Sequence, residues 1–351
     1  MKSFINFLVT ISITGIMTII ILSCASKIFT PKWIDHKGNM MTFIMKGYYE
    51  EEKNSLEVLF TGNSDVYRGI SPMVLYKEYG IASYNYVSAG QRSWIAYTML
   101  EEALKYQNPK IILFNVDELY RDNQATKGNY SKVYDNLRLS TVKLKALLDP
   151  TYDKGRVEKM YHVLPILSYH SRYNELEEKD FKYAYHDWNN PTKGMDLIAK
   201  SVPYRSKKDY MEYTEEVEEL AEVNINYLNK MVKTCKDKGI ELILFEVPSP
   251  DSWNYARHNR IKEYAEDNNL KFIDLNLYNK EIGLNWYKDT SDGGDHLNIY
   301  GAEKTSIFLG KYLVDNYNLK DIRNDKKYEK WEKQYKEYLK IKEAEIKLAQ
   351  Q

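Results

Sequence analysis

The spacing of apolar and polar residues predicts that strands and helices alternate along most of the chain. Short apolar runs end in glycine, asparagine or another turn-forming residue, and a segment with helical spacing separates each run from the next. This alternation is typical of a parallel sheet whose strands are joined by crossover helices. The predicted strands are residues 56–61, 81–90, 111–115, 240–248 and 271–275.

The segments between these strands have the spacing of amphipathic helices. Gly80 and Gly239 each follow such a segment, and glycine commonly ends a helix because it adopts the left-handed conformation readily. The predicted helices are residues 72–79, 96–106, 213–238, 261–268 and 302–317. We therefore expect an α/β fold, a three-layer α/β/α sandwich around a mostly parallel five-stranded sheet.

We place the α/β domain at residues 55–320. One segment interrupts its alternation of strands and helices, and another follows it. Residues 124–205 are polar and tyrosine-rich without a strong strand, so we interpret them as a helical insertion over one end of the sheet. Residues 321–351 are rich in Lys and Glu, with aromatic residues at helical spacing. They predict a charged amphipathic helix that packs on the domain.

The N-terminal segment predicts a membrane anchor. Residues 4–25 carry no charged side chain, and at about 1.5 Å per residue a helix of this length spans about 33 Å, enough to cross a bilayer. The segment has no A-x-A-like cleavage site, and Leu22 fits poorly in a lipoprotein cleavage site before Cys24. We favour an uncleaved transmembrane anchor over residues 1–28, followed by a polar connector over residues 29–54.

Charge and cysteine content narrow the functional classes only a little. Lys2 precedes the apolar segment and Lys27, Lys32 and Lys37 follow it, so the positive-inside rule does not fix the orientation. The chain has 50 basic and 50 acidic residues and a net charge of zero, which argues against nucleic-acid binding. Its two cysteines are too few for a disulfide framework.

The first predicted strand ends at a serine, in the stretch Gly62-Asn63-Ser64-Asp65. Glycine two residues before the serine allows a sharp bend, which can expose the hydroxyl at the carboxyl end of the strand. The same residue types also favour an ordinary turn and helix cap. The stretch is therefore a candidate nucleophile loop whose meaning depends on the rest of the chain.

A second polar loop, residues 287–304, brings Asp292, Asp295 and His296 together before the last predicted helix. A carboxylate on one imidazole nitrogen fixes the tautomer and leaves the other nitrogen free to take a serine proton. We favour Asp292 as this acid, with Asp295 as the alternative, because neighbouring side chains in an extended loop diverge. No second metal-ligand pattern joins the loop, so we predict neither a metal nor a cofactor.

Four predicted loops meet at one edge of the sheet, where ligands bind in open α/β folds. Ser64 follows the first strand, Gly90 ends the second, Asn115 ends the third, and His296 follows the last. They offer a nucleophile, a backbone N–H, a side-chain amide and a base, the groups that acyl transfer needs. The sequence therefore predicts an acyl-transfer site with an oxyanion site at Gly90 and Asn115.

These motifs resemble those of the SGNH, or GDSL-type, hydrolase superfamily, in the branch of membrane-anchored proteins that modify cell-envelope polymers. Residues 62–65 match the block that carries the nucleophile, and residues 88–91 lie where the oxyanion glycine would be. Residues 292–298 resemble the last block, which supplies the acid and the base. The similarity runs over residues 56–314, with the insertion outside the common core.

Two positions depart from the pattern of the family. The third block is usually GxND, whereas residues 114–118 read FNVDE, which leaves the oxyanion role of Asn115 open. The usual acid lies three residues before the histidine, where this chain has Gly293. Either Asp292 or Asp295 would then supply the acid.

The resemblance implies serine-dependent O-acyl transfer, by default of acetyl groups, to hydroxyls of an extracellular polysaccharide. Relatives in alginate or cellulose acetylation and in teichoic-acid D-alanylation suggest that a membrane-bound O-acyltransferase supplies the acyl donor, with the domain outside the cell membrane. The alternatives are a polysaccharide acetyl esterase and a non-catalytic partner subunit of an acylation complex. Aromatic and basic residues that would line the sugar site are Trp94, Arg172, Tyr173 and Trp253.

Overall fold

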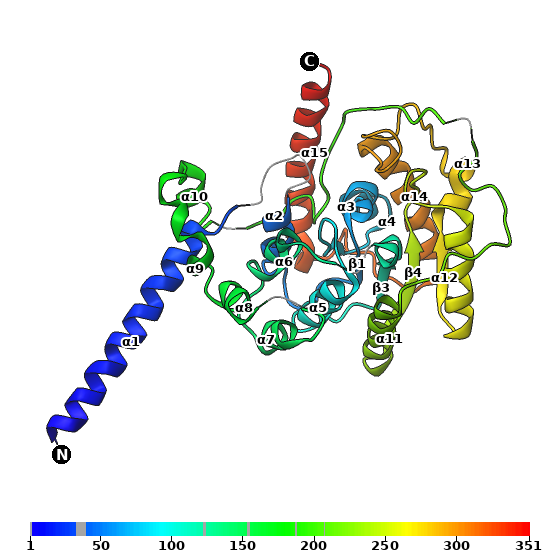
Figure 1. Cartoon of the computed structure of the whole chain (residues 1–351). Helices are drawn as coiled ribbons and strands as arrows, with labels where there is room; N and C mark the ends of the chain where they lie inside the picture. Colours follow the sequence, from blue (N-terminus) through cyan, green and yellow to red (C-terminus); the bar gives the residue numbers. More distant parts are fainter. Residues whose placement is uncertain (1, 33–39, 122–123, 153–154, 187, 207) are drawn as a thin grey trace.

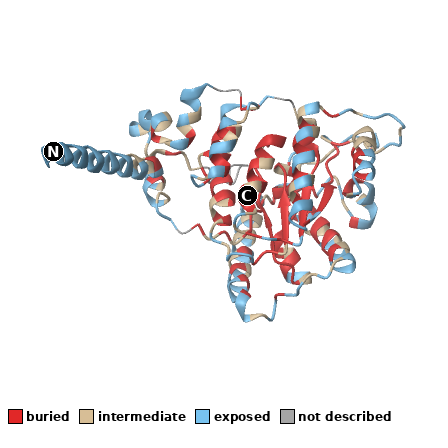
Figure 2. Cartoon of the chain, turned by 90° about the horizontal axis from the view of Figure 1, so that it is seen from below, coloured by how far each residue is buried: buried red, intermediate tan, exposed pale blue. Residues whose placement is uncertain are grey.

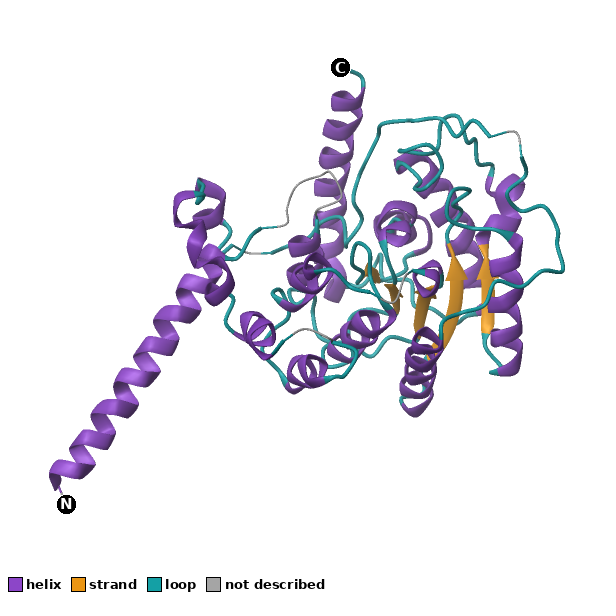
Figure 3. Ribbon diagram, viewed as in Figure 1, coloured by secondary structure: helices purple, strands orange, loops and turns teal. Residues whose placement is uncertain are grey.

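The computed structural model describes residues 2–32, 40–121, 124–152, 155–186, 188–206 and 208–351. Its centre is a five-stranded sheet in the order β2-β1-β3-β4-β5, and every neighbouring pair is parallel (Figure 3). This confirms the predicted α/β fold, although the second strand is much shorter than residues 81–90. The strands are β1 Val58–Thr61, β2 Ser83–Asn85, β3 Ile111–Asn115, β4 Glu241–Glu246 and β5 Lys271–Asp274.

Helices cover both faces of the sheet (Figure 1). On one face α14 packs against α3 and α4, whereas α5 and α11 pack together on the other and α12 lies beside β5. Residues 213–221, expected to begin the helix before β4, are not helical. These helices are α3 Ser64–Gly69, α4 Pro72–Tyr79, α5 Ser93–Ala103, α11 Glu222–Asp237, α12 Tyr255–Asp267 and α14 Ile299–Asn316.

The strand order creates a switch point between β1 and β3. From β1 the chain goes first to the edge strand β2 and then crosses back to β3 on the other side of β1. Ligands bind beyond the carboxyl ends of the strands that flank such a point, because the connecting loops diverge there. Ser64 begins α3 just after β1, and Asn115 is the last residue of β3, so both lie at this point.

The N-terminal helix α1, Lys2–Phe29, is long and apolar enough to cross a bilayer. It projects from the domain with its apolar side chains exposed, and only its C-terminal end contacts the protein (Figure 2). That end packs against the short helices α9, η2 and α10 of the segment predicted as an insertion. The helices of this segment are α6 Lys127–Tyr134, α7 Thr141–Leu148, α8 Arg156–Val163, α9 Ile166–Tyr169, η2 His170–Asn174 and α10 Glu178–Lys182.

The expectation of a polar connector over residues 29–54 is wrong for its second half. Helix α2, Met41–Tyr48, buries Met41, Ile44 and Tyr48 completely in the hydrophobic core. These side chains share one helical face, because they recur at intervals of three and four residues. Residues 33–39 of the predicted connector lie outside the described residues.

The C-terminal segment forms the amphipathic helix α15, Glu329–Ala349, which buries Trp331 and Tyr338. The fully buried Lys193 joins it to distant parts of the chain. Its Nζ lies 2.6 Å from Glu51 and 4.2 Å from the centre of the Trp331 ring. The remaining short helices are η1 Asp117–Tyr120, η3 Leu275–Tyr278, α13 Asn279–Ile282 and η4 Lys326–Tyr328.

Candidate active site

The turn between β1 and α3 places Ser64 at the switch point. Gly62 has a φ of +139°, and a Cβ there would lie 2.6 Å from the Cβ of Asn115. Only glycine permits both this conformation and this close approach of the ends of β1 and β3. The N–H of Ser88 donates to the Gly62 carbonyl at 3.2 Å, which brings the loop after β2 beside the turn. Ser64 is the first residue of α3 and is partly exposed.

Asn63 fixes the turn through both atoms of its amide. Its Oδ1 accepts from the N–H of Asp65 at 2.9 Å, which caps α3, and its Nδ2 donates to Asp117 Oδ2 at 2.9 Å. Asp117 comes from the loop after β3 and also pairs with Arg121 at 2.7 Å. The predicted third block of the sequence therefore supports the nucleophile loop through Asp117.

A tight loop before α14 presents His296. Thr290 and Leu297 pair in an antiparallel bridge that closes the loop, and Asn298 caps α14 directly afterwards. The hydroxyl of Thr290 donates to the His296 carbonyl at 2.9 Å and accepts from the N–H of Gly294 at 2.9 Å. These contacts fix the backbone on both sides of His296, so the position of its ring depends on few remaining degrees of freedom.

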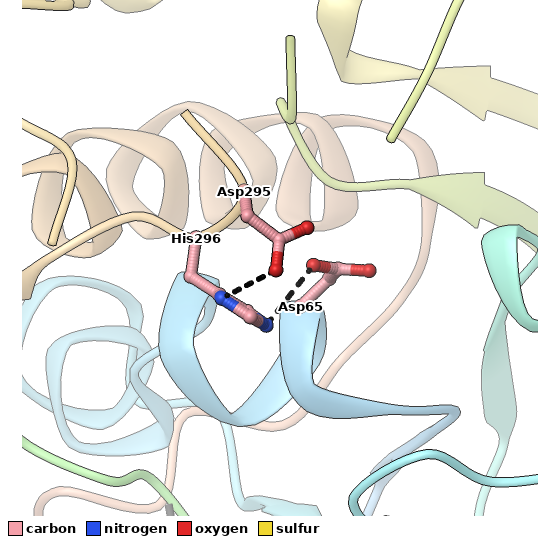
Figure 4. Close-up of side chains that lie close together, drawn as sticks. All are labelled: Asp65, Asp295 and His296. Atoms are coloured by element: carbon pink, nitrogen blue, oxygen red, sulfur yellow. Dashed lines mark ion pairs between the residues drawn. The ribbon is translucent and has the colours of Figure 1, made fainter. Parts of the chain in front are cut away.

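Two carboxylates face the same nitrogen of the His296 ring. Asp292 Oδ2 lies 2.6 Å from Nδ1, and its Oδ1 accepts from the His296 backbone N–H at 2.8 Å. Asp295 Oδ2 lies 3.2 Å from Nδ1 (Figure 4). Because Asp292 makes the shorter contact and a second bond to the same residue, the geometry favours it over Asp295 as the orienting acid.

The other nitrogen of the ring faces a carboxylate that the sequence did not lead us to expect. His296 Nε2 lies 3.7 Å from Oδ1 of Asp65, the residue that follows Ser64, and the figure shows the two side chains approaching each other (Figure 4). Asp65 is 1% exposed, and neither of its oxygens nor Nε2 has a hydrogen-bond partner among the described residues. The hydrogen bond between Ser64 and His296 that a triad uses is therefore not formed in this conformation.

Burial and charge shift the pKa values of both facing groups. Burial alone would lower the pKa of His296, but the hydrogen bond to Asp292 and the charges of Asp65 and Asp295 outweigh it and raise this pKa above 6.5. Burial, assisted by the charge of Asp117, raises the pKa of Asp65 to about 7. Asp65 and His296 therefore influence each other's protonation across the 3.7 Å contact.

The two predicted oxyanion residues lie at the expected edge, with different surroundings. Gly90 has a φ of +58°, and its carbonyl accepts from Asn129 at 2.8 Å. The amide of Asn115 is fully buried, and its Nδ2 donates to Glu246 Oε1 at 3.0 Å. This bond uses one of the two N–H groups of the amide, so the obstacle to a role as oxyanion donor is the burial of Asn115 and not its bond to Glu246.

The four predicted sugar-lining residues are not brought together. Trp94 is buried and donates to Tyr130, while Arg172 and Tyr173 belong to η2, beside the end of α1. Trp253 is also buried, and its indole donates to Asp274 at 2.9 Å, but it lines an open cavity. These contacts argue against a shared sugar site for Trp94, Arg172 and Tyr173.

The cavity that Trp253 lines has a volume of about 740 Å³ and borders the His296 loop. Gly294 of that loop lies against Tyr204 and Pro250, which also line the cavity. Further lining residues, missed from the sequence because they lie in the irregular segment before α11 and at the start of α12, are Tyr210, Tyr213 and Tyr255. The cavity therefore combines aromatic rings with two lining residues that pack against the loop of the candidate base.

Asp65, Asp295 and His296 also have the arrangement of a possible cation site. Each offers one ligand atom, and these atoms lie within 4.8 Å of one another. In the mechanism proposed below Nε2 of His296 accepts a proton, so we interpret the two carboxylates as the charged surroundings of a general base. The sequence does contain one signal for Asp65. It is a carboxylate directly after the candidate nucleophile, and a carboxylate at that position lies close to any base that contacts the nucleophile.

Comparisons with known proteins give distant structural similarities. No protein-family model matches the chain, and no curated protein matches its sequence. A candidate acylhydrolase from Bacteroides fragilis has 14% identity and a TM-score of 0.36, over 80% of this chain and 98% of that one. A candidate lipolytic protein of the G-D-S-L family from Desulfitobacterium hafniense has 12% identity and a TM-score of 0.36, over 73% of this chain and 98% of that one.

A GDSL-like lipase from Bacteroides thetaiotaomicron is similar at the same level, with 12% identity and a TM-score of 0.34 over 74% of this chain and 88% of that one. TM-scores below 0.5 carry no weight for the chemistry of this chain. Its functional interpretation therefore rests on the geometry of Ser64, His296 and their neighbours.

The Asp65 carboxylate should hold the pKa of His296 above 6.5. Replacing Asp65 by Asn removes a buried negative charge that faces Nε2, so the imidazolium loses stabilisation and its pKa should fall. The measurement is an NMR titration of the histidine ring signals of the full chain in detergent. A chelator is present so that no metal ion bound by Asp65, Asp295 and His296 affects the titration. Asp267→Asn, at an exposed position on α12, is the matched control. An unchanged His296 midpoint in Asp65→Asn would show that Asp65 does not control this proton.

Proposed function

We propose that the chain is a serine-dependent acyl-transfer enzyme of the SGNH type, with Ser64 as the nucleophile and His296 as the general base. The observation that carries this proposal is the state of the His296 ring. Nδ1 is held by Asp292 at 2.6 Å, while Nε2 has no hydrogen-bond partner among the described residues and points toward α3. An imidazole oriented in this way can take a proton from a hydroxyl at the start of α3.

In the proposed cycle, Nε2 of His296 takes the proton of Ser64 as Oγ attacks the carbonyl carbon of the acyl donor. The tetrahedral intermediate then expels the donor alcohol, which takes the proton from His296, and an acyl-Ser64 ester remains. A second hydroxyl loses its proton to His296 and attacks this ester. The acyl group passes to that hydroxyl, and Ser64 regains its proton.

The negative charge on the carbonyl oxygen needs hydrogen-bond donors during both attacks. We assign the backbone N–H groups of Ser64 and Gly90 to this role, because the loops that carry them are joined at Gly62. Asn115 joins them through the second N–H of its amide, which the bond to Glu246 does not use. One such donor is typically worth about 10²–10³-fold in rate.

The acceptor that fits the surroundings is a polysaccharide hydroxyl. The cavity of about 740 Å³ beside the His296 loop is wide enough for a saccharide chain, and its aromatic rings offer flat apolar faces. Tyr213, 69% exposed, stands at its surface with its ring 5.2 Å from that of Tyr255. A polar cavity with exposed aromatic rings suits a sugar polymer better than it suits a lipid chain.

The N-terminal helix supports a donor that arrives at the membrane. Helix α1 is long and apolar enough to tether the domain to a bilayer, and a tether raises the effective concentration of reactants held at the same surface. We therefore propose that a membrane-bound O-acyltransferase delivers acetyl groups to Ser64. The domain then works on the outer side of the cell membrane, where such a polymer lies.

A non-catalytic partner role has one observation in its favour. The charged atom that faces Nε2 of His296 belongs to Asp65, and no hydrogen bond joins Nε2 to Ser64 in this conformation. A chain that only positions the polymer or the acyltransferase would not need that bond. Hydrogen bonds of active sites often tighten only when the substrate binds, so the observation alone does not decide against catalysis.

Replacing Ser64 by Ala should abolish acyl transfer. The full chain in detergent would be mixed with p-nitrophenyl acetate and a short oligosaccharide, following both nitrophenol release and acetylation of the sugar. We expect both signals in the wild type and a loss of at least about 10³-fold in the variant, because the covalent intermediate cannot form. Ser168→Ala, at another partly exposed helical position, should remain active.

Two other outcomes of this experiment have distinct meanings. Nitrophenol release without transfer to any of several oligosaccharides would indicate that water is the acceptor, as in an esterase. Equal signals from the wild type, Ser64→Ala and Ser168→Ala would remove Ser64 from the chemistry and leave the non-catalytic role.

Asp292 and Asp295 should differ in their contribution to the rate. Asp292→Asn removes the carboxylate that holds Nδ1 at 2.6 Å, so we expect kcat to fall by about 10²–10⁴-fold. Asp295→Asn removes a contact of 3.2 Å and should cost less than about tenfold. Steady-state kinetics with p-nitrophenyl acetate measures both, and the reverse order would identify Asp295 as the orienting acid.

The cavity predicts which tyrosine binds the sugar. Tyr213→Ala should raise KM for the oligosaccharide by about three- to tenfold, because a stacking face is lost, without changing nitrophenol release in the absence of sugar. Tyr173→Ala is the matched control, since Tyr173 is 72% exposed but lies in η2. An effect of Tyr173→Ala with none of Tyr213→Ala would place the acceptor beside α1.

A further inference from the structure

The place where α1 leaves the domain is built differently from the rest of that helix. Between Phe4 and Ile21 the large apolar side chains are exposed, whereas Ser26 is buried and its hydroxyl accepts from the N–H of Ile166 at 3.1 Å. The Phe29 carbonyl accepts from Arg172 of η2. If the exposed apolar part of α1 fills a bilayer, this junction lies at the level of the lipid headgroups.

A cavity of about 310 Å³ opens at this junction. It lies between the end of α1, helix α2, the start of α7 with the loop before it, and the loop between α8 and α9. Four lysines from three separate segments line it, namely Lys27, Lys32, Lys46 and Lys143. The side chain of Lys32 is 4% exposed and Lys143 is 3% exposed, whereas Lys46 is half-buried and Lys27 is exposed, so the cavity has a buried cationic interior and an open mouth.

These lysines have little negative charge to balance them. Among the described residues, Lys27, Lys46 and Lys143 have no carboxylate within 4.0 Å, and Lys32 has only Asp180 at 3.9 Å. Asp180 itself pairs with Arg172 at 3.3 Å. The ammonium groups instead contact carbonyls and aromatic rings. Lys143 Nζ donates to the Leu137 carbonyl at 3.1 Å, and Lys46 Nζ lies 5.9 Å from the centre of the Trp188 ring.

One further carboxylate lines the cavity but is already engaged. Asp135 accepts from Tyr169 at 2.7 Å with one oxygen, and its other oxygen lies 2.6 Å from His162. Its charge is therefore shared with those two partners. Burial lowers the pKa of Lys32 to about 8; repulsion from Lys46 and Arg172 acts in the same direction, and the charge of Asp180 acts against it. Lys46 also repels Lys143. An anion in the cavity would offset the free-energy cost of burying these ammonium groups and would weaken the repulsion between them.

Exposed apolar side chains lie in the lining of the cavity and on neighbouring helices. Leu139 and Val163 belong to its lining and are 63% and 39% exposed. Further exposed apolar side chains lie on the helices that hold the end of α1, namely Leu167, Tyr173 and Phe181. Exposed apolar and aromatic side chains at a membrane junction insert among lipid headgroups. A cationic interior with an apolar rim suits an amphiphile better than it suits a free ion.

We propose that this cavity binds the phosphate headgroup of an anionic phospholipid, with Lys27, Lys32, Lys46 and Lys143 around the phosphate and Leu139 and Val163 against the acyl chains. The site lies apart from the Ser64 loop and requires no acyl-transfer chemistry. A zwitterionic phospholipid fits less well, because its own ammonium group would enter a cavity that is already positive. A bound anionic lipid would fix how the domain sits on the membrane.

Native mass spectrometry of the full chain in detergent tests this site directly. The probes are short-chain phosphatidylglycerol, short-chain phosphatidylcholine and inorganic phosphate, and the readout is the apparent Kd of each. We expect phosphatidylglycerol to bind more tightly than the other two. Lys27→Gln and Lys46→Gln should each weaken it by about fivefold, since one lysine near an anionic lipid contributes about that factor.

Three further variants make the result specific. Lys46→Arg keeps the charge and should keep the affinity, whereas the exposed Lys236→Gln on α11 should change nothing. Lys27 is exposed, so Lys27→Gln reports on the site even if a change at the half-buried Lys46 disturbs folding. Equal binding of the two lipids, or wild-type binding by the Lys27→Gln, Lys46→Gln double variant, would overturn the proposal. Inorganic phosphate binding as tightly as phosphatidylglycerol would overturn the lipid assignment and leave an anion site.

Discussion

Three buried carboxyl groups behind the strand ends hold the loops of the candidate active site in place. Asp117 accepts from Asn63 of the nucleophile turn, and Glu246 accepts from Asn115 at the end of β3. Glu118 accepts from Gln91 in the orientation of that amide which satisfies both of its atoms, and the same amide also reaches the Gly62 carbonyl. Burial, followed by the charge of Asp117, raises the pKa of Glu118 and Glu246 far above the ordinary range, because a buried negative charge loses its hydration.

The location of this site could be predicted from the sequence, but the contacts between its side chains could not. Gly62, Ser64 and His296 lie at the ends of apolar runs, and parallel strands bring such ends to one edge whatever the tertiary details. Which side chains meet across that edge depends on distances of an ångström or two. The contact of Asp65 with His296, and the use of the Asn115 amide by Glu246, arise from the packing of β1, β3 and β4 and leave no periodic pattern in the sequence.

Away from the site, some features of the fold could also be predicted from the sequence and others could not. The alternation of apolar runs specifies the sheet, because each buried parallel strand must be apolar on both faces. Helix α2 carries an equally clear pattern at Met41, Ile44 and Tyr48, but its position between an anchor and a domain suggested a linker instead of core. Trp94 and Trp253 were expected to line the sugar site on residue type alone. Both are buried, which is the commoner role of such rings, although Trp253 also lines the cavity proposed for the sugar.

The net charge of zero conceals two regions in which like charges are gathered. Carboxyl groups crowd the carboxyl ends of the strands, and lysines crowd the junction with α1. Each arrangement costs folding free energy, since buried like charges repel and lose their hydration. A stable domain could dispense with both by exchanging a few residues for apolar ones of similar size. Their presence is best understood through the functions we propose for them: a general base whose ring is surrounded by carboxylates at one, and an anion site at the junction with α1 at the other.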